Sequence, residues 1–301
     1  MTEVSVKETL MKYNLENKTV LITGGNSGIG KAAAIQLAEM GAKVVIACRS
    51  QERGKKAVED IQNISANANV ELLQMDLASQ QSIREGVAEF LSTHSRLDVL
   101  IHNAANFDQN LKTPVLTEDR VETIFATNHI GVFLMTHLLL DLMKSSAPSR
   151  IINVASKGLV MYPNLDIEFD NLNGERKFSV QHAYYHSKLA QVMFTYDLAD
   201  RLKGTGITVN CIRVTNVAIP DERLTHLPTW LKKIYNIKRK MSITPEKQAQ
   251  TYCFLAADPA VEDISGGYWD ETNHQVKSNK HSYNRETWQK LWNESSRLSN
   301  L

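Results

Sequence analysis

Short apolar stretches rich in β-branched residues alternate along this chain with longer segments that have helical periodicity. The apolar stretches predict buried strands at Thr19–Thr23, Lys43–Ala47, Val70–Gln74, Leu97–His102, Ile151–Val154 and Ile207–Ile212. Amphipathic spacing between them predicts helices at Gly30–Met40, Gln51–Ile64, Gln80–Ser92, Val121–Lys144 and Ala183–Leu202. Strands that alternate with helices indicate βαβ units with right-handed crossovers. We therefore expect an α/β fold, a doubly wound parallel sheet with helices on both faces.

One domain is the simplest organisation for this pattern. The chain has 301 residues, of which 43% are hydrophobic, and this is enough for a single large Rossmann-type domain with a substantial core. Before the C-terminal region we find no linker, repeat or low-complexity segment that would divide it. The prediction is a single domain over residues 1–301, in which residues 1–16 form an N-terminal extension.

Charge and cysteine usage exclude several functional classes. A net charge of +1 gives no support for nucleic acid as a partner. Cys48, Cys211 and Cys253 lack the spacing of a disulfide framework or a zinc site, so we expect no metal. The charged N-terminus fits neither a signal peptide nor a transmembrane segment. We expect a cytoplasmic protein, with peripheral membrane contact as the alternative.

A glycine-rich turn follows the first predicted strand and opens the first helix. It reads Gly24-Gly25-Asn26-Ser27-Gly28-Ile29-Gly30. Glycines permit a tight turn and let a ligand approach the backbone closely. The free N–H groups and the dipole of the helix start then favour a pyrophosphate. A plain strand-to-helix turn needs one glycine rather than four, so we favour a dinucleotide-binding loop.

The end of the second strand bears on the type of nucleotide. An acidic residue at this point would bind the 2′-hydroxyl of NAD, but the sequence reads Ala47-Cys48-Arg49-Ser50. Arg49 can instead pair with a 2′-phosphate, and no Asp or Glu stands beside it to repel that group. We therefore favour NADP(H) over NAD(H). The alternative is that Arg49 is an ordinary solvated side chain.

Tyr184 and Lys188 are four residues apart in a predicted helix and share one of its faces. A free tyrosine has a pKa of about 10, and we expect the neighbouring ammonium group to lower the Tyr184 pKa. Tyr184 could then exchange a proton with the oxygen of a carbonyl or an alcohol. Ser156, just past the fifth strand, could donate a hydrogen bond to the same oxygen. Such pairs are common on ordinary helices, but their order after the glycine turn favours a catalytic interpretation.

These motifs together resemble the short-chain dehydrogenase/reductase family. Thr23-Gly24-x-x-x-Gly28-Ile29-Gly30 matches its dinucleotide signature, and His102-Asn103-Ala104-Ala105 matches two of the four positions of its Asn-Asn-Ala-Gly turn. The chain is most similar to retinol-dehydrogenase-like members, and this resemblance extends from about Leu15 to near the C-terminus. It is carried by Ala47-Cys48-Arg49, Asn128-His129-x-Gly131, Tyr185-His186-Ser187-Lys188-Leu189-Ala190, Pro245-Glu246-x-x-Ala249-Gln250-Thr251, Ser265-Gly266-x-Tyr268 and Leu291-Trp292.

The resemblance also implies site residues. Asn128 becomes a fourth catalytic candidate beside Ser156, Tyr184 and Lys188, with the role of holding a water that connects to Lys188. Lys188 is further implied to bind the nicotinamide ribose. The candidate cofactor-binding residues are Gly24, Asn26, Ser27, Gly28, Ile29, Gly30, Arg49, Asp76, Leu77, Asn103, Ala104, Lys188, Asn216 and Val217.

Three segments differ from the simplest family members or vary within the family. Val214-Thr215 replaces the usual Pro-Gly, and Ile219 stands about where a Thr would contact the carboxamide, so we expect an altered loop at Val214–Ile219. Residues of about 216–243 correspond to the family's substrate lid; a basic amphipathic membrane patch and an ordinary surface helix remain open for this segment. The segment Lys157–Ala183 is an insert between Ser156 and Tyr184. In related carbonyl reductases, inserts of this kind cover the helix face that would otherwise form a dimer, so both a monomer and a homodimer are possible.

The expected function is NADP(H)-dependent interconversion of a carbonyl and an alcohol by hydride transfer, on a small-molecule substrate that is bulky and lipophilic. Two alternatives stay open. One is reduction of a carbon–carbon double bond, as in the related protochlorophyllide reductases. The other is an NADP(H)-binding regulator without turnover.

Overall fold

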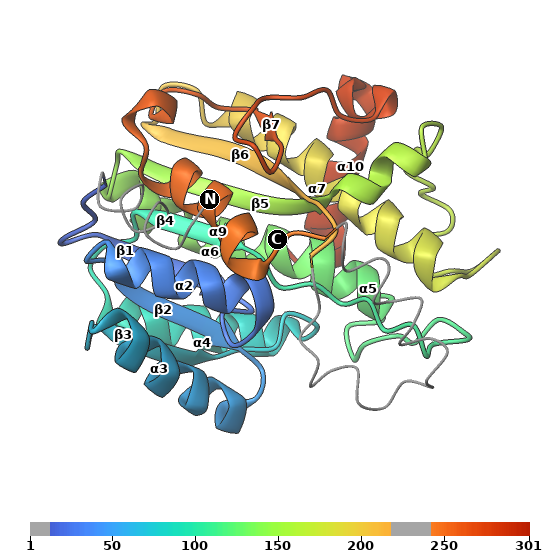
Figure 1. The fold of residues 1–301 in the computed structure, drawn as a ribbon. Coiled ribbons are helices and arrows are strands. Elements are labelled where there is room, and N and C mark those ends of the chain that lie inside the picture. Colours follow the sequence, from blue (N-terminus) through green and yellow to red (C-terminus); the bar gives the residue numbers. More distant parts are fainter. Residues whose placement is uncertain (1–12, 218–241) are drawn as a thin grey trace.

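A seven-stranded parallel sheet forms the centre of the protein, in the order β3-β2-β1-β4-β5-β6-β7 (Figure 1). The computed structural model describes residues 13–217 and 242–301. The strands are β1 (Thr19–Thr23), β2 (Lys43–Cys48), β3 (Val70–Gln74), β4 (Val99–His102), β5 (Ser149–Ser156), β6 (Ile207–Val214) and β7 (Tyr268–Trp269). The strand order reverses between β1 and β4. Open α/β sheets bind their ligands in the crevice at this reversal.

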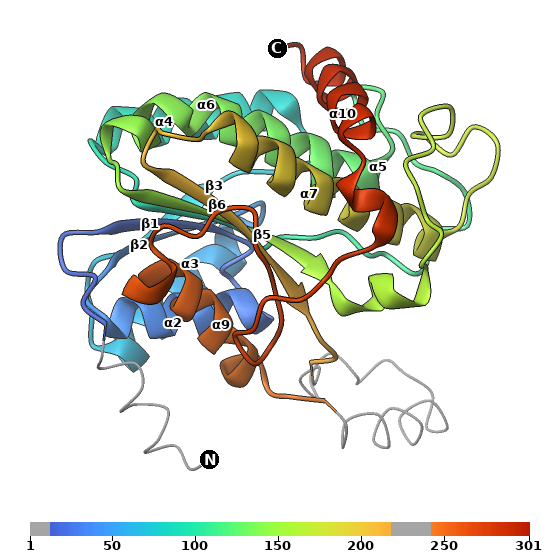
Figure 2. The same cartoon turned by 90° about the horizontal axis from the view of Figure 1, so that it is seen from above.

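Helices cover both faces of the sheet (Figure 2). One face carries α2 (Gly28–Glu39), α3 (Gln51–Ser65) and α9 (Pro245–Ala257). The other carries α4 (Gln80–Thr93), α6 (Gly131–Ser145) and α7 (Val180–Arg201), and α10 (Arg285–Leu298) packs against α7. Because successive strand residues point to opposite faces, Val20 and Ile22 enter one hydrophobic cluster while Leu21 enters the other. The α/β fold predicted from the sequence is confirmed.

All six predicted strands are present within a few residues of their expected ends. The predicted helix Val121–Lys144 is interrupted: a short α5 (Thr123–Phe125) leads into a π-helical turn, η1 (Ala126–Ile130), before α6 begins. The Glu122 carboxylate starts this segment by accepting hydrogen bonds from the N–H groups of Ile124 and Phe125, at 3.0 Å each. Isolated π turns often occur at functional sites, and this one contains Asn128.

Two different segments cover α7. The insert after β5 packs on its first half, where the Glu168 N–H donates to Nε2 of His186 at 2.9 Å. The helix α10 lies on its second half, where the Arg201 guanidinium carbon is 3.7 Å from the centroid of the Trp292 ring. The outer face of α7 is therefore shared between the insert and the C-terminal helix, and the oligomeric state stays a prediction.

The lid expected at about 216–243 falls largely on residues 218–241, which lie outside the described residues, as do residues 1–12 of the expected N-terminal extension. Within the described ranges, one helical stretch, Thr123–Ser145, has the length and apolar composition to cross a membrane. Of its most apolar window, 72% is buried inside the protein. The same stretch contributes α6 to the core between the sheet and the outer helices.

Asp98 joins the amino-terminal ends of β1 and β4. It is buried and accepts hydrogen bonds from the Thr19 N–H at 2.9 Å, from Arg96 at 2.6 and 2.8 Å and from Lys18 at 3.0 Å. Burial alone would raise the pKa of Asp98, but these hydrogen bonds outweigh it and hold the pKa below its ordinary value. The ionised carboxylate therefore stabilises the folded state at neutral pH.

We expect Asp98→Asn to lower the free energy of unfolding by about 2–3 kcal/mol at neutral pH, because buried donors lose a charged acceptor. Since the folded-state pKa is lowered, this stabilisation is present above the unfolded-state pKa and is lost as the pH falls through the folded-state value. Urea denaturation at neutral and acidic pH measures both effects. The exposed Asp141→Asn serves as the control, and equal stability of the two variants at neutral pH would contradict the prediction.

Candidate active site

The glycine turn after β1 adopts a backbone that other residues tolerate poorly. Gly24 has a φ of +69° and Gly28 a φ of +57°, both in the left-handed region. A Cβ on Gly30 would lie 2.4 Å from the carbonyl oxygen of Gly24, so this position has no room for a side chain. A Cβ on Gly28 would meet nothing within 4 Å. The turn therefore packs tightly beneath Gly30 and is open at Gly28, where α2 begins.

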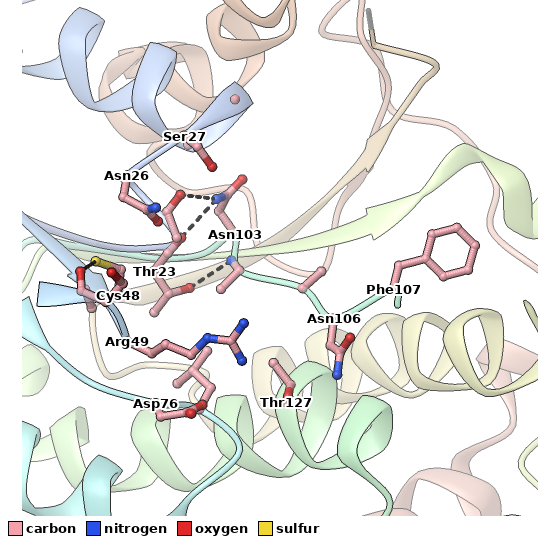
Figure 3. A pocket seen from close by; sticks show the side chains of 18 of the residues that line it. Thr23, Asn26, Ser27, Cys48, Arg49, Asp76, Asn103, Asn106, Phe107 and Thr127 are labelled. Carbon is pink, nitrogen blue, oxygen red and sulfur yellow. Dashed lines mark hydrogen bonds between the residues drawn. The ribbon is translucent and has the colours of Figure 1, made fainter. Parts of the chain in front are cut away.

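Asn103, at the end of β4, braces this turn from the neighbouring strand (Figure 3). Its Nδ2 donates to the carbonyl oxygens of Thr23 at 2.9 Å and Gly24 at 3.3 Å. Its Oδ1 accepts from the Tyr252 hydroxyl on α9 at 3.0 Å. The N–H of Ala104 donates to Oγ1 of Thr23 at 3.1 Å. Sequence reasoning marked Asn103 as a cofactor contact, and the structure shows that it also fixes the shape of the loop.

A cavity of about 740 Å³ opens beside this turn, at the carboxyl ends of the strands near the β1–β4 reversal. Most of the predicted cofactor residues line it: Gly24, Asn26, Ser27, Gly28, Ile29, Gly30, Arg49, Asp76, Leu77, Asn103, Ala104 and Val217. Asn216 and Lys188 are not in this lining. Asn216 instead accepts a hydrogen bond from the Ile243 N–H at 3.0 Å through its carbonyl oxygen.

Two arginines line one end of the cavity. Arg49 follows β2 directly, and Figure 3 shows its side chain between Asp76 and Thr127. Arg53 lies in the first turn of α3, where its N–H donates to the capping Oγ of Ser50 at 3.4 Å. Sequence reasoning missed Arg53. Arg49 precedes the extended N-cap Ser50 and Arg53 lies inside α3, so no helical spacing relates the two, and a basic residue in the first turn after β2 was the one available signal.

The candidate catalytic side chains meet at the end of β5. The side chain of Ser156, the last residue of β5, approaches the Tyr184 phenol on α7 closely enough to lower its pKa. The Oγ of Ser156 also accepts from the Gly158 N–H at 3.2 Å. Phe107, from the loop after β4, packs on the Tyr184 ring with 4.3 Å between ring centroids. Tyr185 points elsewhere and packs on Tyr162.

Lys188 lies beneath Tyr184 and is 1% exposed. Its Nζ donates to the carbonyl oxygen of Val154 and to Oε1 of Gln191, each at 2.7 Å. The same nitrogen lies 5.8 Å from the centroid of the Tyr184 ring. Burial lowers the pKa of Lys188 to about 7. Neutral acceptors therefore bind the ammonium, and its pKa lies close to neutral pH.

The Tyr184 pKa differs from the expectation. Burial, with a smaller contribution from Tyr185, raises the pKa of Tyr184 to about 12, although the hydrogen bond with Ser156 acts in the opposite direction. The expected lowering by Lys188 is therefore wrong for this arrangement. The physical reason is that Lys188 directs two of its protons to Val154 and Gln191, while the phenol pays the cost of desolvation.

Asn128 connects three parts of the site from the π turn η1. Its Oδ1 accepts from the Asn106 N–H at 2.6 Å, and its Nδ2 donates to the Asn106 carbonyl at 3.0 Å and to Oγ of Ser187 at 3.0 Å. Ser187 in turn donates to the carbonyl oxygen of Tyr184 at 2.7 Å. The resemblance implied a water link from Asn128 to Lys188. That link stays a prediction, and the direct partners of Asn128 are the loop that carries Phe107 and the turn of α7 that carries Tyr184.

We expect Lys188→Met to change how stability depends on pH. The ammonium has a pKa of about 7 in the folded protein and about 10.4 in an unfolded chain. Between these values the unfolded chain binds more protons, so wild-type stability rises with pH relative to the variant. Urea denaturation measures the free energy of unfolding of both proteins. Relative to wild type, the value for the variant should fall by about 2–3 kcal/mol between about pH 6 and about pH 9.

The exposed Lys144→Met provides the control for this comparison, since its difference from wild type should stay constant over the same range. A constant difference for Lys188→Met as well would show that Lys188 titrates normally in the folded protein.

Known proteins resemble this chain over most of its length. A family model for short chain dehydrogenases matches residues 18–166. Human retinol dehydrogenase 14 is 39% identical over 293 residues, covering 92% of this chain and 85% of that protein. Human retinol dehydrogenase 13 is 39% identical over 298 residues, with coverage of 96% and 87%.

Solved structures agree at the level of the fold. An uncharacterised protein from Mycobacterium paratuberculosis has a TM-score of 0.71 at 24% identity, over 96% of this chain and 95% of that one. Levodione reductase has a TM-score of 0.68 at 22% identity, over 85% and 96%. The nearly complete coverage by relatives, together with the cavity beside the glycine turn, shows that this chain belongs to the short-chain dehydrogenase/reductase family, as an oxidoreductase that uses a nicotinamide dinucleotide to interconvert carbonyl and alcohol groups.

Proposed function

We propose that this chain is an NADP(H)-dependent oxidoreductase that acts on the carbonyl or alcohol group of a bulky apolar substrate, with Tyr184 as the general acid and base. The observation that carries the proposal is the meeting of the Ser156 and Tyr184 side chains at the end of β5, one helical turn from Lys188. Ser156 ends β5 at the same carboxyl edge of the sheet at which the cavity opens.

The cavity fits a dinucleotide chemically. The N-terminus of α2 and the open position at Gly28 suit a pyrophosphate. Asp76 and Leu77 would contact the adenine, and Lys188 would bind the nicotinamide ribose with the ammonium proton that Val154 and Gln191 do not use. When bound, the nicotinamide supplies or accepts the hydride. Arg49 and Arg53 together offer two guanidinium groups for a 2′-phosphate, which supports NADP(H) over NAD(H).

The protein's own residues handle the proton. In reduction, the carbonyl carbon receives the hydride, and Tyr184 gives its phenolic proton to the carbonyl oxygen, so that an alcohol forms. Ser156 donates a hydrogen bond to the same oxygen and stabilises its developing negative charge. The raised pKa keeps Tyr184 protonated at neutral pH, as an acid must be. In oxidation, Lys188 has to approach the phenol to stabilise the phenolate.

Two observations support a bulky apolar substrate. Both human relatives are named as retinol dehydrogenases, and retinol is a bulky apolar alcohol. In this chain the 3-10 helix η2 (Lys157–Met161), directly after Ser156, exposes Val160 at 68% and Met161 at 77%. Phe107 adds an aromatic surface over Tyr184. Apolar and aromatic side chains beside a reactive group are typical of sites that take apolar ligands.

The direct test is oxidation of NADPH, and separately of NADH, with a panel of hydrophobic aldehydes and ketones. We expect turnover that prefers NADPH, and a loss of about 10²–10⁴ in kcat/KM for Tyr184→Phe because the proton donor is gone. NADPH affinity should stay unchanged. Tyr185→Phe, one residue along and packed on Tyr162, is the matched control and should retain activity.

Undiminished turnover by Tyr184→Phe would reject its acid and base role. Tight NADPH binding without turnover of any carbonyl would favour a non-catalytic regulator instead.

The arginine pair gives a separate prediction. We expect Arg49→Ala and Arg53→Ala each to weaken NADPH binding about 10-fold to 100-fold, since each loses a charge-assisted contact to phosphate. NADH binding should change little. Lys55→Ala, an exposed cation on α3 outside the cavity lining, is the control. Isothermal titration with both nucleotides measures this, and equal losses for NADPH and NADH would refute the assignment.

A further inference from the structure

A stripe of polar side chains follows the inner face of α7. Tyr184, Lys188, Gln191 and Thr195 recur at spacings of three and four, so they lie above one another on the helix. Lys188 is 1% exposed, and Gln191 and Thr195 are completely buried. Buried polar groups cost free energy unless they have internal partners. The hydrogen bonds that these buried side chains make inside the protein therefore explain why polar residues are tolerated there.

Gln191 provides the side-chain acceptor for the Lys188 ammonium, with 2.7 Å between Oε1 and Nζ. The other acceptor for this ammonium is the Val154 carbonyl on β5, also at 2.7 Å. The titratable groups around the ammonium are the Tyr184 phenol on α7 and the Cys211 thiol on β6. In the described part of the chain, no carboxylate is among the groups that act on Lys188.

The groups one step further from Lys188 are also neutral. From β7, the Tyr268 hydroxyl donates to the Ser156 carbonyl at 3.5 Å, and on α9 burial and the nearby Tyr184 phenol raise the pKa of Tyr252. From η1, His129 bonds Ser295, and burial lowers the pKa of His129 to about 3, so it is neutral near pH 7. Stabilisation of the ammonium therefore depends on dipoles, and Gln191 supplies the side-chain dipole nearest to it.

The orientation of the Gln191 amide fits a role as hydrogen-bond acceptor for Lys188. Its Oε1 must face Lys188, because the opposite orientation would place an NH₂ group against an ammonium. Its Nε2 is buried and has no hydrogen-bond partner in the described chain. Its backbone is anchored, since Oγ1 of Thr195 donates to the Gln191 carbonyl at 2.8 Å and accepts from Asn153 on β5 at 2.9 Å. An apolar side chain of equal size would avoid the unpaired Nε2, so the Lys188 contact is the compensating interaction.

We infer that Gln191 is a positioning residue for Lys188: its amide oxygen keeps the buried ammonium charged and seated against β5, one turn below Tyr184. The catalytic consequence of this inference rests on the proposed function, because Lys188 must be charged to stabilise the Tyr184 phenolate and to bind a ribose. The contact itself is a property of the folded chain and does not depend on turnover.

The amide oxygen should set the pH at which Lys188 loses its proton. Removing the acceptor disfavours the charged form and lowers the pKa of a lysine, whereas a carboxylate in its place favours the charged form and raises it. Gln191→Met and Gln191→Glu, which are close in size to glutamine, therefore shift the Lys188 titration in opposite directions. A residue that only fills space would not produce shifts of opposite sign.

The experiment is a pH titration of ¹³Cε-lysine NMR signals in the cofactor-free protein, with the Lys188 signal assigned from its absence in Lys188→Met. Relative to wild type, we expect the midpoint to fall by about one pH unit in Gln191→Met and to rise by about one unit in Gln191→Glu. Gln36→Met is the matched control: Gln36 is also a buried glutamine, but it joins α2 to α9 on the other side of the sheet, and its loss should leave the Lys188 midpoint in place.

Unchanged midpoints, or shifts of the same sign in both Gln191 variants, would overturn the inference. If Gln191→Met does not fold, Gln191→Glu decides alone, and a midpoint at or below the wild-type value overturns it. The pH profile of kcat/KM, measured beside the NMR titration, separates the two proposals. Opposite NMR shifts without any turnover would retain the positioning role and reject the proposed function, whereas turnover with unmoved midpoints would do the reverse.

Discussion

The side chain of Asn103 holds together the two strands between which the sheet reverses its order. Its amide reaches the carbonyl oxygens of Thr23 and Gly24 on the β1 side and the Tyr252 hydroxyl on α9. Because the amide has both donors and an acceptor, one residue can fix a glycine turn that has few side chains of its own. The closed packing at Gly30 involves this brace directly, because a Cβ there would lie 2.4 Å from Nδ2 of Asn103. Without it, the glycine turn would have the freedom that glycine brings to any chain.

The catalytic end of the site has a different physical character. Here a lysine and a tyrosine are withdrawn from water, and the cost of desolvation dominates the pKa of both. Burial disfavours the ammonium of Lys188 and the phenolate of Tyr184 alike, so Lys188 is brought close to losing its proton while Tyr184 holds its proton more firmly. A structure optimised for stability would replace Lys188 with an apolar side chain. A buried lysine in the core is typical of a functional site, where groups with perturbed pKa values are retained because the chemistry needs them.

The π turn η1 links these two ends. An α-helix through Val121–Lys144 would have continued unbroken, but the extra residue in the turn redirects the side chains that follow Phe125. Asn128 thereby reaches both the backbone of Asn106 and the Ser187 hydroxyl. Phe107 lies on Tyr184 as a result of this arrangement, since its loop is tied to η1 immediately before it. The loop after β4, the π turn and the first half of α7 therefore behave as one packed unit.

The sequence by itself determined six of the seven described strands, most of the helices, the glycine turn and the placement of Tyr184 and Lys188 on one helix face, because strand and helix periodicity and the conformational freedom of glycine are local properties. It also placed most of the cavity lining, since residues after parallel strands gather at one edge of the sheet. Tertiary structure alone decided the direction of the Tyr184 pKa shift, the break in the helix at η1 and the approach of Arg53 to the cavity. It also decided that Lys188 faces Gln191 and Val154 rather than the phenol. Desolvation and hydrogen-bond partners depend on segments far apart in the chain, so no local pattern around Tyr184 or Lys188 contained them.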